Sequence, residues 1–332
     1  MGLYFNAEHL RRASFMRYIT VSELSNMIRK NLWKIPHDID LIVGIPRSGM
    51  LPATMIALFL NTRLTDIDSF VEDGGCFSNG LSRGKYVKKD KIKKVLIVDD
   101  SIFSGNSLSD AKRKLKAVLS EYEYTFCVPI ATTIGAAKVD IFFEIIDEDR
   151  VFEWNIFHHL VLSKACVDID GVLCLDPVED DDGEKYQLFI QTATPLFLPT
   201  CKINTLISCR LEKYRSLTEN WLAQNNILFD QLIMLDFPDK ATRVEWNKHG
   251  RYKGKYYRQR TDCVLFIESS LKQANTIAEI SNKPVYCVEN NTMIYIPPAI
   301  STKKKVLHAI RKIFPHEYLW LRSKYHKMTG LT

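Results

Sequence analysis

Short apolar segments rich in β-forming residues recur along the 332-residue chain, and patterns typical of helices separate them. In the first half the apolar segments are "DLIVGI" (40–45), "KVLIVD" (94–99), "TFCVPIAT" (125–132) and "IFFEII" (141–146). Helical patterns occupy 50–61 and 106–122. A strand without polar alternation is buried on both faces, so this order predicts a parallel sheet covered by helices.

The same order restarts in the second half of the chain. Its apolar segments are "KACVDIDGVL" (164–173), "TLISC" (205–209), "LIMLDF" (232–237), "CVLFIES" (263–269) and "PVYCVEN" (284–290), and its predicted helices are 211–226 and 270–281. A chain of this length can bury two hydrophobic cores. We therefore expect two α/β domains, residues 1–162 and 163–332, that join near Leu162–Lys164.

Composition limits the class of protein. The net charge of +6 is mildly basic and suits small anionic ligands as well as nucleic acid. The eight cysteines include no C-x-x-C pair, which favours buried thiols in a reducing compartment over disulfides or a zinc site. The first residues lack the apolar region of a signal peptide, and no apolar segment reaches membrane-spanning length. We expect a cytoplasmic protein that binds no nucleic acid.

Two adjacent carboxylates end one of the apolar segments, in "VLIVDDSIFSGNS" (95–107). In an open parallel sheet, ligands bind at the carboxyl ends of the strands. The following loop leads into a predicted helix, and backbone N–H groups at such a place form an anion site. A ligand that carries one phosphate and a pair of hydroxyls, such as a ribose 5-phosphate, would use both features.

This segment resembles the phosphoribosyl-pyrophosphate (PRPP) motif of type I phosphoribosyltransferases. The resemblance implies that Asp99 and Asp100 bind the 2- and 3-hydroxyls of the ribose. It also implies that the 5-phosphate is bound by Ser101, Ser104, Gly105, Asn106 and Ser107.

Two further segments of the first half agree with this resemblance. "LIVGIPRSGMLPA" (41–53) stands where the family has its pyrophosphate loop, although the usual form is richer in glycine; an ordinary β–α turn is the alternative. The residues that match in kind are Pro46, Arg47, Ser48 and Gly49. The basic segment 71–91 stands where the family has a mobile loop that closes over PRPP. Closure would bring Arg83 and Lys85 to the pyrophosphate, and a solvated basic hairpin is the alternative.

A different motif opens the second half, where "VDIDGVL" (167–173) places Asp168 and Asp170 after an apolar strand. Two carboxylates on one side of a loop suit Mg²⁺ together with nucleophilic attack on phosphorus. The motif resembles the first motif of the haloacid dehalogenase superfamily. That resemblance implies that Asp168 becomes a phospho-aspartate and that Asp170 is the general acid and base.

The other motifs of that superfamily also have counterparts. Ser208 ends a predicted strand and would bind the transferring phosphoryl group, and Lys253 or Lys255 would be the charge-neutralising lysine. Glu268 would hold Mg²⁺ together with Asp168 and Asp170. The sequence departs from the superfamily after Glu268, because serines follow where a second acidic residue is common.

The tandem resembles the dual-domain bacterial ribofuranosyltransferases of surface polysaccharide (O-antigen or capsule) assembly. It implies transfer of 5-phosphoribosyl from PRPP to a hydroxyl of a glycan, which we expect to be lipid-linked, and then removal of the 5-phosphate. A nucleobase phosphoribosyltransferase fused to a nucleotidase, and a PRPP-sensing regulator without catalysis, are the alternatives. Because the motif sets are separate, we expect each domain to work when the chain is cut near Leu162.

The segment 302–327 is basic, with apolar residues at helical spacing that Pro315 interrupts. It would either contact the anionic inner face of a membrane, near lipid-linked glycans, or pack on the second domain with its lysines in water.

Overall fold

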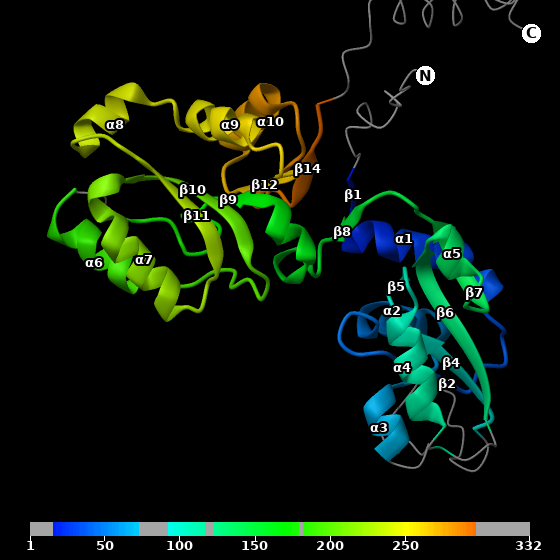
Figure 1. The fold of residues 1–332 in the computed structure, drawn as a ribbon. Coiled ribbons are helices and arrows are strands. Elements are labelled where there is room, and N and C mark those ends of the chain that lie inside the picture. Colours follow the sequence, from blue (N-terminus) through cyan, green and yellow to red (C-terminus); the bar gives the residue numbers. More distant parts are fainter. Residues whose placement is uncertain (1–15, 73–91, 117, 119–121, 179–181, 297–332) are drawn as a thin grey trace, which may run out of the picture.

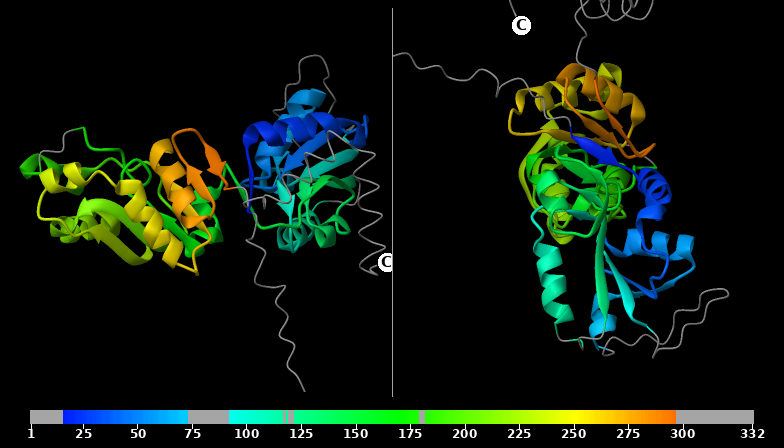
Figure 2. Two further views of the ribbon diagram at one scale, coloured as in Figure 1. Left: turned by 90° about the horizontal axis from the view of Figure 1, so that it is seen from above. Right: turned by 90° about the vertical axis from the view of Figure 1, so that its right-hand side faces the viewer.

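The computed structural model describes residues 16–72, 92–116, 118, 122–178 and 182–296. These residues fold around two separate, mainly parallel sheets, which Figure 1 shows as two lobes. Two turned views show an elongated molecule with the short strand β1 at the junction of the lobes (Figure 2).

The first sheet has the strand order β3-β2-β4-β6-β5, and β7 pairs with β6. Every pairing in it is parallel, so the parallel sheet predicted for the first half is confirmed. Its strands are β2 Leu41–Gly44, β3 Arg63–Asp66, β4 Lys94–Val98, β5 Ser101–Ile102, β6 Glu123–Ala131 and β7 Ile141–Ile145.

Helices cover both faces of this sheet. On one face Ile42 and Leu96 pack into a core with α1 and α2, and on the other Val43 and Val95 pack with α3 and α4. Successive strand residues thus point into different cores, which explains the unbroken apolar runs in the sequence. The helices are α1 Val21–Asn31, α2 Met50–Leu60, α3 Ile67–Glu72, α4 Asn106–Leu115 and α5 Thr133–Ala136.

The second sheet has the order β11-β10-β9-β12-β13-β14 and is parallel except for β14, which runs antiparallel to β13. Its strands are β9 Ala165–Val167, β10 Ile203–Leu211, β11 Phe229–Leu235, β12 Leu265–Glu268, β13 Val285–Cys287 and β14 Thr292–Ile294. Its helices are α6 Glu184–Thr192, α7 Arg215–Gln224, α8 Lys240–Trp246, α9 His249–Gln259 and α10 Leu271–Ser281. The order puts β9, with its two aspartates just beyond it, between β10 and β12.

A two-stranded parallel ribbon lies where the two lobes meet. It pairs β1 (Arg17–Ile19) with β8 (Arg150–Phe152). Tyr18 belongs to the same buried cluster as Leu162 and Val167, so one core continues across the predicted join. The Tyr18 N–H donates to the hydroxyl of Tyr295 at 3.2 Å, and the Tyr18 hydroxyl donates to Oδ1 of Asn291.

Several predicted boundaries were wrong. The strand expected over 164–173 ends at Val167, because Gly171 adopts a left-handed φ of 71° and its N–H donates to the Cys174 carbonyl at 2.8 Å, which closes a turn. The helix expected over 211–226 begins only at Arg215, since β10 runs on to Leu211. The helix expected over 106–122 is α4, which ends at Leu115.

Other expectations concern cysteines, membrane spans and segments beyond the described residues. The cysteines within the described ranges are free thiols; most are buried, as predicted, but Cys201 and Cys209 are only partly buried. Among the described residues, no helix is long and apolar enough to cross a membrane. Arg83, Lys85 and the basic segment 302–327 lie outside the described residues.

Candidate functional sites

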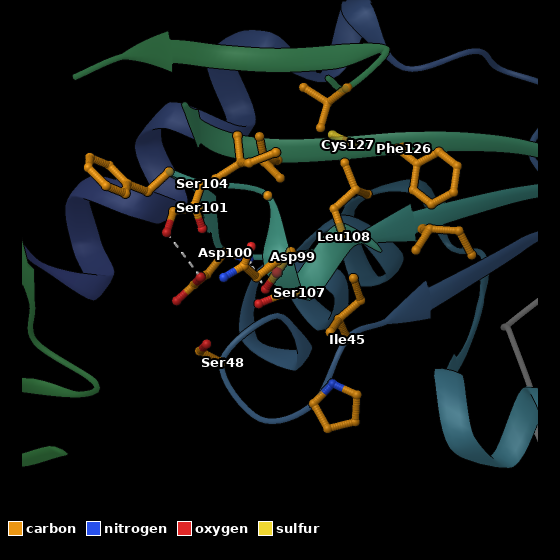
Figure 3. Close-up of a pocket in the computed structure, with 18 residues that line it drawn as sticks. Ile45, Ser48, Asp99, Asp100, Ser101, Ser104, Ser107, Leu108, Phe126 and Cys127 are labelled. Carbon is orange, nitrogen blue, oxygen red and sulfur yellow. Dashed lines mark hydrogen bonds between the residues drawn. The ribbon is translucent and has the colours of Figure 1, made fainter. Parts of the chain in front are cut away.

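A pocket of about 260 Å³ lies at the carboxyl end of β4. The turn after β2 contributes Pro46 and Ser48 to it, and the segment after β4 contributes Asp99, Asp100 and residues 101–107. Figure 3 shows the hydroxyls of Ser48, Ser101 and Ser107 around the two carboxylates. The structure thus brings together most residues that the sequence predicted to bind PRPP. Arg47 and Gly49 lie in the same turn but do not line the pocket.

Gly49 sets the distance between the two loops. A Cβ atom there would stand 2.5 Å from the Ile45 carbonyl oxygen and 2.8 Å from the Val98 carbonyl oxygen, so no larger residue fits without a backbone shift. The Pro46–Arg47 peptide bond in this turn is cis. The Ile45 N–H donates to the Val98 carbonyl at 2.8 Å and so holds the start of the turn against the end of β4.

The loop after the two aspartates ends at the N-terminus of α4. Gly105 precedes the helix with a left-handed φ of 85°, a conformation that residues with a side chain rarely adopt. Lys138 donates from Nζ to the Ser104 carbonyl at 2.7 Å and so fixes the loop from outside. Free N–H groups of the first helical turn and the serine hydroxyls together make an anion site of the kind that binds phosphate.

Asp100 is held in place by a residue far along the chain. The indole Nε1 of Trp154 donates to Asp100 Oδ2 at 2.9 Å, and the Ser101 hydroxyl lies 3.3 Å from Oδ1. Asp100 is 6% exposed. Trp154 stacks on Phe152 of β8 with a ring separation of 4.7 Å, so the ribbon between the lobes orients the carboxylate.

Asp99 has the most unusual electrostatics in this pocket. Burial, and next the neighbouring charge of Asp100, raise the pKa of Asp99 to about 7. The Asp100 N–H donates to Asp99 Oδ1 at 2.9 Å. Among the described residues neither carboxylate forms an ion pair, so both remain available as acceptors for ligand hydroxyls.

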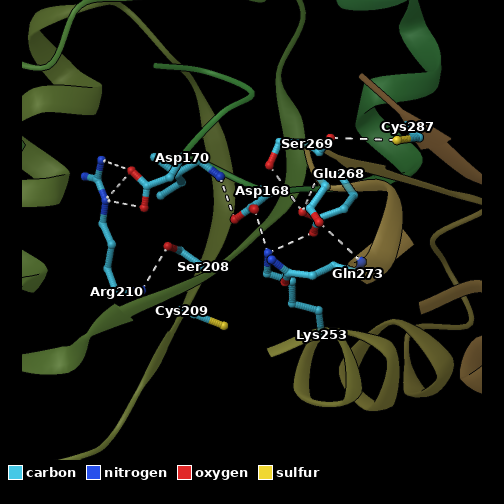
Figure 4. Close-up of polar contacts among 12 residues, drawn as sticks. Asp168, Asp170, Ser208, Cys209, Arg210, Lys253, Glu268, Ser269, Gln273 and Cys287 are labelled. Atoms are coloured by element: carbon cyan, nitrogen blue, oxygen red, sulfur yellow. Dashed lines mark hydrogen bonds and ion pairs between the residues drawn. The ribbon is translucent and has the colours of Figure 1, made fainter. Parts of the chain in front are cut away.

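A second cluster of ionisable residues lies at the carboxyl ends of β9 and β12 (Figure 4). Nζ of Lys253 donates to Asp168 Oδ2 at 2.5 Å and to Glu268 Oε2 at 2.8 Å. All three side chains are buried. Burial disfavours the ammonium form, yet Asp168 and Glu268 together raise the pKa of Lys253 and keep it charged.

The sequence left open whether Lys253 or Lys255 neutralises charge beside Asp168, and their positions on α9 distinguish them. Lys253 lies on the buried face of α9, whereas Lys255 is exposed and points away from the two carboxylates. Gly254 allows this close packing, because a Cβ there would meet Ile280 of α10 at 3.1 Å. Of the two candidates, the structure places only Lys253 beside Asp168.

Asp170 has a partner that the sequence reasoning missed. Arg210 is fully buried and donates to Asp170 through Nε, at 3.1 Å to each oxygen, and through Nη2, at 2.6 Å to Oδ1. Ser208 is also fully buried, and its hydroxyl accepts from the Arg210 N–H at 3.1 Å. Figure 4 shows Ser208 between the two aspartates and Arg210.

The carboxylates of the predicted metal set are thus divided between two cationic partners. Lys253 binds Asp168 and Glu268, and Arg210 binds Asp170. Within the described ranges, no group of three or more His, Cys, Asp or Glu side chains is placed to hold a metal. This arrangement does not fit a metal held by all three carboxylates, and the set stays a prediction. Phosphoribosyltransferases in general use Mg²⁺ with PRPP.

Comparison with protein families gives a match for the first lobe. The family described as "Phosphoribosyl transferase domain" matches residues 17–161, which is less than half of the chain. The match to this family supports PRPP as the donor substrate. No curated protein matches the chain.

Solved structures similar to this chain include two phosphoribosyltransferases. They are the purine enzyme of Pyrococcus horikoshii (19% identity, 42% of this chain and 93% of that one, TM-score 0.32) and the xanthine-guanine-hypoxanthine enzyme of Helicobacter pylori (19%, 43% and 94%, 0.33). A chain of the Pnkp1/Rnl/Hen1 complex is similar over 75% of this chain and 94% of its own length, at 16% identity and a TM-score of 0.31. These TM-scores are low, so the assignment rests on the family match and on the residues themselves.

Two residues of the candidate sites were not predicted from the sequence. Trp154 lies 54 residues after Asp100, and only the fold brings the two together. Arg210, in the second lobe, left a clearer signal. An arginine inside an apolar strand needs a carboxylate as partner, and Asp170 follows the neighbouring strand β9.

Proposed function

We propose that this chain transfers 5-phosphoribosyl from PRPP to a hydroxyl of a glycan and then removes the 5-phosphate to leave ribofuranose. The transferase half of this proposal rests on the family match and on the pocket at the end of β4. The glycan acceptor and the phosphatase half are the parts that go beyond them.

In the transfer step, the residues of the pocket hold the donor. Asp99 and Asp100 accept hydrogen bonds from the 2- and 3-hydroxyls of the ribose, and the serines with the N-terminus of α4 donate to the 5-phosphate. Hydrogen bonds to a charged group contribute about 1.5–3 kcal/mol each to ligand binding. The bond from C1 to pyrophosphate breaks, the acceptor oxygen bonds to C1, and the hydroxyl proton leaves to solvent or to a neighbouring base.

In the second step, the cluster around Asp168 acts on the phosphate. A carboxylate oxygen of Asp168 attacks phosphorus and the ester bond to the ribose breaks. Asp170 takes a proton from water and passes it to the ribose oxygen. Water then attacks the phospho-aspartate and releases orthophosphate. Ser208 holds the phosphoryl oxygens, and Lys253 neutralises charge beside Asp168.

The observation that carries this proposal is the buried contact of Lys253 with both Asp168 and Glu268. Burying ionisable groups costs several kcal/mol per ion, and buried groups with shifted pKa values cluster at functional sites. The product of phosphoribosyl transfer carries a phosphomonoester, which is the substrate that such a cluster would consume. With a nucleobase as acceptor, the same pair of reactions would make a nucleotide and destroy it, so a glycan is the better acceptor.

The direct test is product stoichiometry with the full chain, PRPP and glycan acceptors. We expect pyrophosphate and orthophosphate in equal amounts, and a product that mass spectrometry identifies as glycan plus one pentose. Release of pyrophosphate with nucleobases but not with glycans would support the nucleobase alternative. Binding of PRPP without release of either phosphate would support the regulator.

A further inference from the structure

A second cavity, of about 400 Å³, adjoins the PRPP pocket. The two cavities share Ser48, Asp100, Ser101 and Phe103 in their linings, so they meet at the carboxylate that faces the ribose. Figure 3 shows Ser48, Asp100 and Ser101 together on one side of the pocket. A molecule in the second cavity would therefore lie next to a ribose bound at Asp100.

The loop between β7 and β8 makes this second cavity acidic. Among the described residues, the lining of the cavity has the acidic residues Asp100, Asp147, Glu148 and Asp149, and Arg150 is its basic residue. Asp147 is engaged, because its two oxygens accept from the N–H and the hydroxyl of Thr133 at 2.8 and 2.6 Å. Glu148 and Asp149 are exposed and face solvent at the rim.

Two polar side chains deeper in the cavity are suited to hydroxyl groups. Oδ1 of Asn155 is buried without a hydrogen-bond partner, an arrangement that is costly unless a ligand donates to it. Nδ1 of His159 accepts from the Val161 N–H at 3.1 Å, so in the neutral ring Nε2 carries the proton and donates. Burial, and next the charge of Arg150, lower the pKa of His159 and favour that neutral ring.

An aromatic ring completes the lining. Phe103 is 73% exposed, and the Arg150 guanidinium lies 6.0 Å from its ring centre. An exposed ring beside hydrogen-bonding groups matches the C–H and O–H faces of a pyranose.

We propose that this second cavity binds the acceptor as an uncharged, hydroxyl-rich sugar, with Asn155 accepting from and His159 donating to its hydroxyls, and with Glu148 and Asp149 excluding anionic sugars. This inference rests on the proposed function and adds the position and class of the acceptor. Like charges at the rim would repel a uronic acid or a sugar phosphate at this end of the glycan.

The test measures pyrophosphate release by the full chain from PRPP. The probes are the methyl glycosides of glucose, galactose, N-acetylglucosamine, rhamnose and glucuronic acid, with adenine, guanine and hypoxanthine as the nucleobase arm. We expect one or more uncharged glycosides to stimulate release, and the glucuronide to be inactive. Asn155→Ala and His159→Gln should each raise the KM for the active glycoside about tenfold and leave the KM for PRPP within about twofold.

If Asn155→Ala fails to fold, Glu148→Lys still tests the proposal. The Glu148 side chain is exposed, so its replacement should not disturb folding. It should increase the activity on glucuronide relative to glucoside at least about tenfold. Glu144→Lys, an equally exposed change on β7 outside both cavities, is the control and should leave this ratio unchanged.

The outcomes separate this inference from the function it rests on. If calorimetry shows that PRPP does not bind, the proposed function fails. If PRPP binds but no glycoside stimulates release, the glycan acceptor of the proposed function is wrong. If glycosides do stimulate release, but Glu148→Lys and Glu144→Lys shift the glucuronide ratio equally, the acceptor site alone is wrong.

Discussion

Asp99 and Asp100 stand next to each other at the end of a buried strand, and this pair sets the chemistry of the PRPP pocket. Their mutual repulsion is not relieved by an ion pair among the described residues. The pocket is therefore arranged for a ligand rather than for stability, as expected where residues are retained for binding.

The raised pKa of Asp99 predicts a pH-dependent stability. The pKa rises from 3.8 in a free chain to about 7 when folded, so folding takes up a proton between these values. The unfolding free energy should then fall as the pH rises from about 4 to 7. Asp99→Asn should raise it at pH 8 by roughly 2–4 kcal/mol relative to wild type, with little difference at pH 4. Urea unfolding at both pH values measures this.

Asp147 provides the control for that experiment, because the opposite sign is expected. Hydrogen bonds from Thr133 lower the pKa of Asp147, so its carboxylate form stabilises the fold above the unfolded pKa. Asp147→Asn should lower the unfolding free energy at pH 8. An identical pH profile for wild type and Asp99→Asn would contradict the assignment of Asp99 as the proton-binding group.

Asp168→Asn tests the second step of the proposed function. An amide cannot form a phospho-enzyme, so the variant should still release pyrophosphate but should accumulate a glycan that carries ribose and phosphate together. Mass spectrometry distinguishes this product from plain ribosyl-glycan by the mass of one phosphate. Lys255→Met is a matched control, since Lys255 is exposed and does not contact the carboxylates. Fully dephosphorylated product from Asp168→Asn would show that Asp168 is not the nucleophile.

At the scale of elements, the turn after β2 packs directly against the loop after β4, because Gly49 has no side chain between them. Gly49→Ala would place a methyl group 2.5 Å from the Ile45 carbonyl oxygen. We expect a loss of about 1–3 kcal/mol in stability, together with weaker PRPP binding as the turn moves away from Asp99. Thermal unfolding and calorimetry measure the two effects. Ser48→Ala, which adds no atoms, should leave stability within about 0.5 kcal/mol, and equal losses in both variants would argue against a steric cause.

The sequence predicted those elements whose pattern is local. The apolar strands β2, β4 and β12 and the helices α2 and α10 follow from unbroken apolar runs and helical periodicity. β1 and β8 were missed because three-residue strands carry no periodicity and form only when distant segments pair. The early end of β9 was missed because Val172 and Leu173 are apolar for a different reason, as buried residues of a turn.

In the candidate sites, too, the sequence predicted residues in local motifs and missed residues that depend on distant contacts. Motifs placed Asp99, Asp168 and Glu268 at strand ends, and the sheet order brought the last two together. Sequence could not choose between Lys253 and Lys255, because only the contact of α9 with α10 decides which face is buried. Trp154 and Arg210 act through contacts 54 and 40 residues along the chain, which no local pattern encodes.

At the scale of the whole molecule, the join between the lobes is a core and not a linker. Met16 and Tyr18 pack in one cluster with Val151, Leu162 and Val167. A cut between residues 162 and 163 would expose this surface to water, at about 25 cal/mol for each Å² of apolar area. We therefore expect the separate fragments 1–162 and 163–332 to be less stable than the intact chain, contrary to the independence that the motifs indicate.

Complementation of two intact variants avoids that difficulty. Asp168→Asn mixed with the double variant Asp99→Asn/Asp100→Asn should restore the fully dephosphorylated product, because the phosphorylated glycan can diffuse from one molecule to the other. Product analysis of each variant alone and of the mixture is the measurement. If the mixture yields only phosphorylated product, the intermediate does not pass through solution and both reactions require one chain.

The hydrogen bonds of Tyr18 have a consequence for how the protein is made. Its partner Asn291 is 273 residues further along the chain. At roughly 5–20 residues per second, a ribosome synthesises that distance in about 14–55 s. During this interval Tyr18 lacks its contacts with Tyr286 and Asn291, so part of the surface of β1 has no cover. A chain whose synthesis stops before β13 and β14 would have a complete first lobe but would leave that surface exposed. Quality-control proteases could recognise this surface and so distinguish unfinished molecules from finished ones.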